Sequence, residues 1–106
     1  MKTVITSEGN SVNAEFDLRF GRAAYFCIVD ENSGSVEFIP NIHKDSLGGA
    51  GTKASETILE HGVKKVISGD FGPKAKDVLE KFGVQMVILS EKPANVQAVI
   101  DFLKIK

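Results

Sequence analysis

Two glycine-rich segments directly precede predicted helices and carry residue types that bind anions. Residues 48–53 are GGAGTK and residues 68–74 are SGDFGPK. Glycine leaves backbone N–H groups uncovered, and a helix N-terminus carries a partial positive charge, so each segment suits an anion. Lys53, Lys74 and Arg22 could each add a cation. Neither segment matches a complete Walker A or dinucleotide-binding motif, so the alternative that its glycines only form a turn stays open.

The two histidines have different expected roles. His61 lies at the predicted C-terminal end of a helix, where a cation complements the helix dipole, so its role is expected to be structural. His43 lies in a loop near the glycine-rich segments. As a metal ligand it would need partners such as Glu8, Asp17 or Asp70, and no fixed spacing such as H-E-x-x-H supports that set. The metal ligands therefore stay unassigned.

The sequence contains no recognisable catalytic arrangement. Cys27 falls in the middle of a predicted strand among aromatic and aliphatic residues, so we expect a buried, inert thiol. Two histidines and such a thiol do not make a Ser-His-Asp or Cys-His site. Metal-dependent nucleases hold metal ions with several carboxylates, one of them on the first strand, but residues 2–7 (KTVITS) contain no acid. We expect a protein that is not an enzyme, with phosphate-ester hydrolysis as the remaining catalytic alternative.

The composition is that of one ordinary globular domain. The chain has 106 residues, of which 42% are hydrophobic and 25% charged, with 13 Lys+Arg against 14 Asp+Glu. A net charge of −1 gives no broad positive field, which disfavours binding to nucleic acid or a membrane, so any anion must be captured locally. A single Cys and the absence of a long apolar run in the sequence predict a cytoplasmic location.

Hydrophobic periodicity and turn residues predict five strands and three helices. Alternating apolar residues and short buried runs predict the strands at residues 2–7, 23–30, 35–39, 65–68 and 84–89. Apolar stripes of helical spacing predict the helices, the first capped by Thr52 and ended by Gly62, the second running from Pro73 to Gly83, and the third opening at Pro93 and continuing almost to the C-terminus.

This element order predicts an α/β fold with a mixed sheet. A meander of the first three strands, followed by right-handed crossovers, gives the strand order 3-2-1-4-5 with only the second strand antiparallel. The first two helices then cover one face and the third helix covers the other. That second face is under-covered, and residues 9–22 or a second subunit could cover it. Residues 7–22, 41–53 and 69–74 are expected to meet at one edge of the sheet, where ligands of such folds bind.

Three stretches of the sequence resemble a known family. They are RFGRAAYFCIVD (residues 19–30), GGAGTKA (48–54) and GVKKVISGDFGPKAKDVLEKFGV (62–84). Together they are similar to the dinitrogenase iron-molybdenum cofactor biosynthesis family, the small domains of NifX and NafY type that are also found fused to NifB. The resemblance implies that residues 1–106 form a single domain with a ribonuclease H-like fold. It also implies a non-catalytic protein that binds or carries iron–sulfur or iron–molybdenum cofactor precursors and works with cofactor-assembly proteins.

The resemblance also implies a set of binding residues. Many family members have HFGR where this chain has Arg19 before Phe20, so a histidine is missing. A polyanionic cluster could still be held by backbone N–H groups, Arg19 and Arg22, with His43 as a further candidate. A regulatory or scaffold domain that contacts a protein through the under-covered face is the alternative function, and the expected state is a monomer or weak homodimer. The expected cofactor-binding residues are Arg19, Phe20, Gly21, Arg22, His43, Gly48, Gly49, Gly51, Gly69 and Gly72, with Pro73 beside them.

Overall fold

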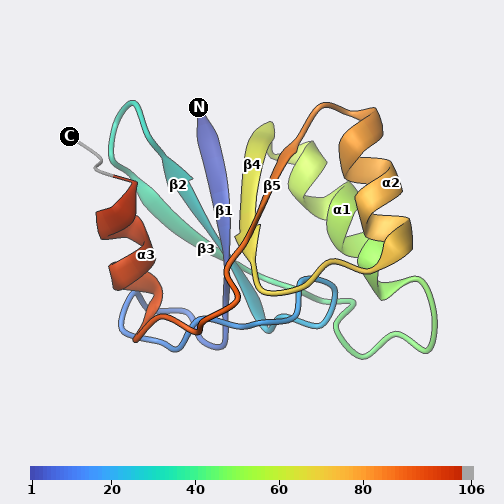
Figure 1. Ribbon diagram of the computed structural model, residues 1–106, viewed down its shortest axis with the longest axis horizontal. Helices are drawn as coiled ribbons and strands as arrows, with labels where there is room; N and C mark the ends of the chain where they lie inside the picture. The colour runs from blue at the N-terminus through green and yellow to red at the C-terminus, as the bar shows by residue number, and fades with distance from the viewer. Residues whose placement is uncertain (104–106) are drawn as a thin grey trace.

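The computed structural model describes residues 1–103 and contains the five strands and three helices that the sequence predicts. The sheet has the order β3-β2-β1-β4-β5, and only β2 runs antiparallel to its neighbours, as predicted (Figure 1). The relation to ribonuclease H stays a prediction. The elements are β1 (Lys2–Ser7), β2 (Tyr25–Asp30), β3 (Val36–Pro40), α1 (Ala50–Glu60), β4 (Val63–Ser68), α2 (Pro73–Lys81), β5 (Gln85–Ile88) and α3 (Val96–Phe102).

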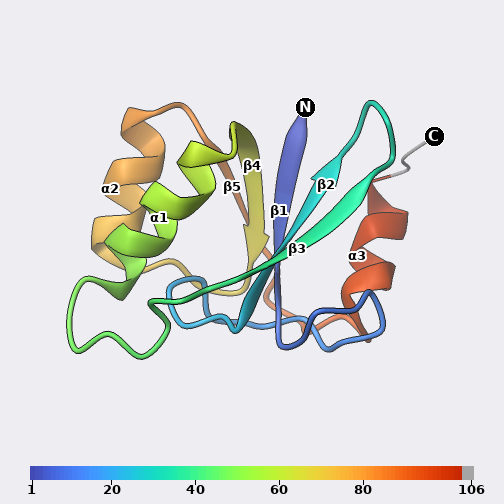
Figure 2. The same cartoon turned by 180° about the vertical axis from the view of Figure 1, so that it is seen from behind.

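The sheet separates two hydrophobic cores. Along β2, Phe26 and Ile28 point into the core beneath α1 and α2, whereas Cys27 and Val29 point into the core beneath α3. This alternation follows from the two-residue period of a strand. Figures 1 and 2 show α1 and α2 on one side of the sheet and α3 alone on the other, as the handedness rule predicts.

The segment between β1 and β2 crosses from one face of the sheet to the other. Phe16 packs in the core beneath α3, and Phe20 packs in the core beneath α1 and α2. The backbone of Val12 and Ala14 accepts hydrogen bonds from Gln97 N and Val96 N of α3, at 2.8 and 3.0 Å. The first half of the segment therefore covers part of the α3 face, in agreement with one of the two predicted options.

Several predicted boundaries were wrong by one to three residues. The N-cap of α1 is Gly49 and not Thr52, because a left-handed backbone at Gly49 (φ 72°) turns the chain into the helix earlier. The third helix begins after Asn95 and not at Pro93, because the Asn95 side chain caps it. The strands beginning at Tyr25, Val36, Val63 and Gln85 are likewise shifted or resized, and predictions for residues 104–106 lie outside the described residues.

No helix within residues 1–103 is both long enough and apolar enough to cross a membrane. The longest, α1, has 11 residues.

Candidate functional site

The N-terminal ends of α1 and α2 lie side by side and form two adjoining hollows. The first, of about 330 Å³, lies between Gly49, Gly51 and Thr52 of one segment and Gly72 and Lys74 of the other. The second, of about 290 Å³, continues from Gly51 and Gly72 to the turn from Arg19 to Arg22. Since Ala50, Gly51 and Gly72 line both, we treat the two spaces as one site and call it the glycine hollow.

Glycine at two positions lets the three segments approach this closely. A Cβ atom at Gly21 would lie 2.9 Å from the backbone N of Gly51, and a Cβ at Gly51 would lie 3.3 Å from the Cβ of Ala75. The first contact is closer than real Cβ atoms come to backbone, so only glycine fits at Gly21 without a shift of α1. The 19–22 turn therefore meets the backbone of α1, and α1 approaches α2 where Gly51 faces Ala75.

The ends of both helices that face the glycine hollow are electrically positive. The first N–H groups of a helix have no partner within it, and neither Gly49 nor Gly72 supplies a capping side chain. Neither first turn contains an acid, and Lys74 adds a positive charge at the start of α2, where the helix dipole disfavours it. An anion in the hollow would satisfy these groups together.

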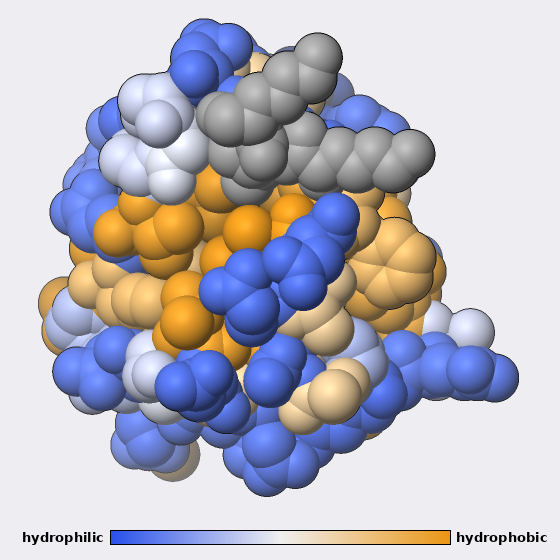
Figure 3. All heavy atoms as spheres, turned by 90° about the vertical axis from the view of Figure 1, so that its left-hand side faces the viewer, coloured by the Kyte–Doolittle hydropathy of each residue, from blue (hydrophilic) through white to orange (hydrophobic). Residues whose placement is uncertain are grey.

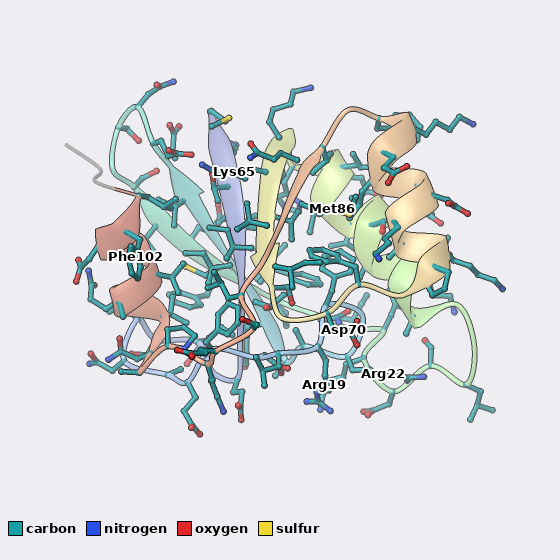
Figure 4. All side chains as sticks on the ribbon, in the orientation of Figure 1. Arg19, Arg22, Lys65, Asp70, Met86 and Phe102 are labelled. Atoms are coloured by element: carbon teal, nitrogen blue, oxygen red, sulfur yellow. The ribbon has the colours of Figure 1, made fainter. Side chains whose placement is uncertain are left out.

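Arg22 holds the loop that leads into α1. Its Nη1 donates hydrogen bonds to the carbonyl oxygens of Lys44 and Ser46, at 2.8 and 2.7 Å. Arg22 also lines the glycine hollow, and Figure 4 shows it at the same end of the molecule as Arg19 and Asp70. One guanidinium therefore both fixes the loop and places positive charge at the site.

Arg19 is positioned by the buried Asp17. The Nε of Arg19 lies 3.2 Å from Asp17 Oδ1, and the Arg19 backbone N donates to the same oxygen at 3.0 Å. Hydrogen bonding to Asp17 raises the pKa of Arg19. The Arg19 side chain stays 64% exposed, so its guanidinium is fixed at one end and open to solvent at the rest.

The predicted metal ligands are not brought together. Glu8 pairs with Lys92 at 3.0 Å, and Asp17 pairs with Arg19, so both carboxylates have other partners. Asp70 lines the glycine hollow as its one acid among the described lining residues. In residues 1–103 no group of three or more His, Cys, Asp or Glu side chains could hold a metal ion.

The thiol is remote from the hollow. Cys27 is fully buried in the core beneath α3, as predicted, and burial raises its pKa to about 12. Cys27 lines neither part of the glycine hollow, so it supplies no ligand there.

Three of the ten predicted cofactor-binding residues do not line the hollow. His43 lies in the loop before α1, where its backbone N–H donates to Asn41 Oδ1 at 3.2 Å. Gly48 precedes the αL residue Gly49 and meets open space. Gly69 serves packing, because a Cβ there would lie 2.8 Å from the carbonyl oxygen of Leu18.

Phe20 lines the hollow but belongs mainly to the core. It is 1% exposed, and its ring lies 5.9 Å from that of Phe26 and 5.1 Å from that of Phe71, centroid to centroid. This aromatic cluster fixes the base of the 19–22 turn, so Phe20 positions Gly21 and Arg22.

Asn41 is a site-supporting residue that the sequence analysis missed. It is buried, and its Nδ2 donates to the carbonyl oxygens of Gly21 and Ala23, at 3.0 and 2.9 Å. An Asn directly after Pro40 at a strand end is an ordinary turn signal, so its role was visible only once the loop and the 19–22 turn were placed together.

Comparisons with known proteins agree with this architecture. The apo form of the orange protein from Desulfovibrio gigas has a TM-score of 0.87 at 31% identity, covering 97% of this chain and 87% of that one. A Thermotoga protein provisionally named a NifB protein has a TM-score of 0.84 at 32% identity, covering 97% and 86%. An uncharacterized protein of Methanocaldococcus jannaschii is 29% identical over 89 residues, 81% of this chain and 72% of the relative. The family model described as dinitrogenase iron-molybdenum cofactor matches residues 1–104, and the chain therefore belongs to this family, as its sequence motifs predict.

Proposed function

We propose that this protein is a non-catalytic carrier of an iron–sulfur or iron–molybdenum cofactor precursor, or of a related small metal–sulfur anion, held in the glycine hollow. The observation that carries the proposal is the meeting of two uncapped helix N-termini with the 19–22 turn. Membership in a family involved in iron–molybdenum cofactor biosynthesis supports the metal–sulfur chemistry. The related orange protein has been described in an apo form, a term for a protein without its bound group.

The chemistry of the hollow suits carriage. Backbone N–H groups and the guanidinium groups of Arg19 and Arg22 bind an anion by hydrogen bonds and charge, which form and break without exchange of a covalent metal ligand. The buried Cys27 does not reach the hollow to form such a ligand. A cargo held in this way is released whole when an acceptor supplies stronger ligands.

Gly72 provides a direct test of the site. Its φ of −66° and ψ of 161° suit any L residue, a Cβ there meets no atom within 4 Å, and Gly72 lines both parts of the hollow, so a valine at this position should narrow it. Purified protein is mixed anaerobically with ferrous iron, sulfide and molybdate, desalted, and measured by visible absorption and metal analysis. We expect coloured uptake by the wild type and at least about a tenfold loss of affinity in Gly72→Val, the loss of one charge-assisted contact or more.

Gly48→Val is the matched control, because a Cβ at Gly48 also meets no atom and Gly48 lies outside the hollow. Uptake by this control should equal that of the wild type. Equal uptake by both variants would place the cargo elsewhere, and no uptake by the wild type would reject the carrier function.

Two substitutions of Arg22 distinguish the effect of its charge from its effect on the position of the loop. Arg22→Ala should weaken uptake by removing the cation and releasing the carbonyls of Lys44 and Ser46. Arg22→Lys keeps the charge but cannot reproduce the forked donor geometry. Uptake restored by lysine would assign the effect to charge, whereas equal losses in the two variants would assign it to the loop.

A further inference from the structure

The two edges of the sheet differ in their protection against further strand pairing. β3 carries the charged residue Glu37 and ends in Pro40, both of which discourage an added strand. β5 contains no charged residue and no proline, and the residue that follows it, Leu89, is apolar. Figure 1 looks onto the β5 edge, and within residues 1–103 no element pairs with its outer side. β5 is short, with four residues, but it lacks the charge and the proline that protect β3, so of the two edges it is the one more open to a further strand.

The backbone groups that face this edge can be assigned. The N–H of Leu89 donates to Ser68 O of β4 at 2.9 Å, so Leu89 and Val87 direct their backbone polar groups inward. Because these groups alternate along a strand, Met86 and Ile88 direct theirs outward. Both outward residues are apolar.

From this edge we propose that the protein forms a homodimer in which β5 pairs antiparallel with β5 of a second copy, around a two-fold axis at Val87. Met86 of one copy then exchanges both backbone hydrogen bonds with Ile88 of the other, and the two Val87 side chains face each other in a non-hydrogen-bonded pair. The two sheets become one continuous sheet through an isologous contact.

Side-chain chemistry favours a second copy as the occupant. In this register Met86 faces Ile88 on the face of α1 and α2, Val87 faces Val87 on the face of α3, and Gln85 faces Leu89, so no like charges meet. A net charge of −1 per chain gives little repulsion between copies. The strand is therefore complementary to itself without any other partner.

The surroundings of β5 offer apolar surface for the same contact. Ile88 is 54% exposed and Phe102 is 80% exposed. A groove of about 300 Å³ runs between β5 and α3, lined by residues that include Val87, Leu89 and Phe102. Figure 3 shows hydrophobic surface gathered on this α3 side of the molecule. A two-fold axis normal to the sheet brings the grooves of both copies to the same face, beside the paired strands.

Sedimentation velocity across a concentration series tests the dimer. We expect the mass to rise with concentration from 11.4 kDa toward twice that value. Ile88→Lys should hold the protein at the monomer mass, because two lysines would be buried at the pairing. Val36→Lys is the matched control, since Val36 is also an exposed edge-strand residue, 39% exposed, but lies on β3. A monomer at every concentration, or a dimer disrupted equally by both variants, would overturn the proposal.

Cysteine cross-linking tests the register. Val87→Cys should form a disulfide-linked dimer under mild oxidation, because a non-hydrogen-bonded pair brings two Cα atoms to about 4.5 Å. Ile88→Cys should not, because Ile88 faces Met86 of the other copy. Cys27 is fully buried and stays out of the reaction. Cross-linking of Ile88→Cys without Val87→Cys would reject this register, and circular dichroism of both variants checks that each is folded.

Discussion

The glycines around the hollow act through three different physical properties. Gly49 supplies a left-handed backbone, Gly21 supplies a close approach to α1, and Gly72 leaves space empty. The sequence does not show these differences, because all three positions hold the same residue type and the differences arise from backbone conformation and long-range packing. At the scale of the residue, the pattern predicted where a site could lie but not what each glycine does there.

Gly21→Ala should destabilise the protein by about 1–3 kcal/mol, the usual cost of an added group in a tightly packed place. The added Cβ would press on the backbone of Gly51, which cannot rotate away as a side chain does. Urea unfolding followed by circular dichroism measures the change. Gly48→Ala, which meets open space, should differ from the wild type by much less, and equal effects would contradict the close-approach role.

The buried thiol predicts a loss of stability in alkaline solution. Burial raises the pKa of Cys27 from 9.0 to about 12, so the folded state holds the proton that the unfolded state releases above pH 9. The stabilising contribution is complete below pH 9 and is lost as the pH rises from 9 toward 12, by at most about 1.4 kcal/mol per pH unit.

The Cys27→Ser variant is the comparison, because a serine hydroxyl does not ionise in this pH range and its unfolding free energy lacks the pH dependence that Cys27 causes. The difference in unfolding free energy between wild type and Cys27→Ser should shrink between pH 9 and 10.5. A difference that stays constant with pH would contradict the assignment. Native Cys27 should also react with a thiol reagent only after unfolding.

At the scale of the element, the three helices begin in two different ways. Asn95 accepts a hydrogen bond from Ala98 N at 2.9 Å and caps α3, whereas α1 and α2 begin at glycines without a side-chain cap. A capping side chain would occupy the N–H groups that face the hollow. The uncapped ends are therefore those that point at the proposed cargo.

Gly72→Asp should separate stability from uptake. An aspartate at the N-cap of α2 would satisfy its N–H groups and complement its dipole, raising stability by about 0.5 kcal/mol, while its charge would repel an anion. Thermal unfolding and anaerobic uptake are measured on the same sample. Asn32→Asp makes the same change in charge in the exposed turn between β2 and β3, away from both helix ends, and a similar loss of uptake in that variant would indicate a general charge effect.

Asn95→Ala should cost about 1 kcal/mol of stability, because the Ala98 N–H loses its partner. Asn95→Ser keeps a capping oxygen and should retain most of that stability. Chemical unfolding gives both values. Cargo uptake should be unchanged in both variants, since α3 lies on the other face of the sheet (Figure 2).

The helices and strands were predictable because apolar residues recur at regular spacing within them. The residues at which they begin and end were not predictable. The stripe through Ala54 and Ile58 predicted α1, and both residues are buried. Its start depended on the left-handed Gly49, and glycine at positions 48, 49 and 51 gave equal local signals. For α3, Pro93 and Asn95 are both typical helix-start residues, and only the hydrogen bond to Ala98 decides between them.

At the scale of the whole molecule, the right-handed crossover rule predicted the strand order, and the strand order predicted where the site would lie. Right-handed crossovers placed the ends of β1 and β4 at one edge, which is why the loops after them could be predicted to meet. The absence of His43 from the hollow could not be predicted, because the 41–49 loop is held by Arg22 and Asn41, long-range contacts without a sequence signature.

The whole sheet predicts a pattern of hydrogen exchange. Amides of β1 and of inward-facing β4 residues should exchange most slowly, because they are buried at the centre, and β3 amides should exchange faster. If two copies pair through β5, the amides of Met86 and Ile88 should become protected as concentration rises, while β3 amides stay unchanged. Spectra at two protein concentrations measure this, and uniform slowing of all amides would indicate general association.

The crossing segment between β1 and β2 ties the two helical layers of the molecule together. Its first half holds α3 through Val12 and Ala14, and its second half forms a wall of the hollow with Gly21 against α1. A protease cut near residue 18, or a circular permutation opened there, would break the covalent link between these two contacts. Termini engineered into the turn between β2 and β3, at residues 31–34, would leave that tie unbroken, so a permutant of this protein that keeps its cargo should be opened there.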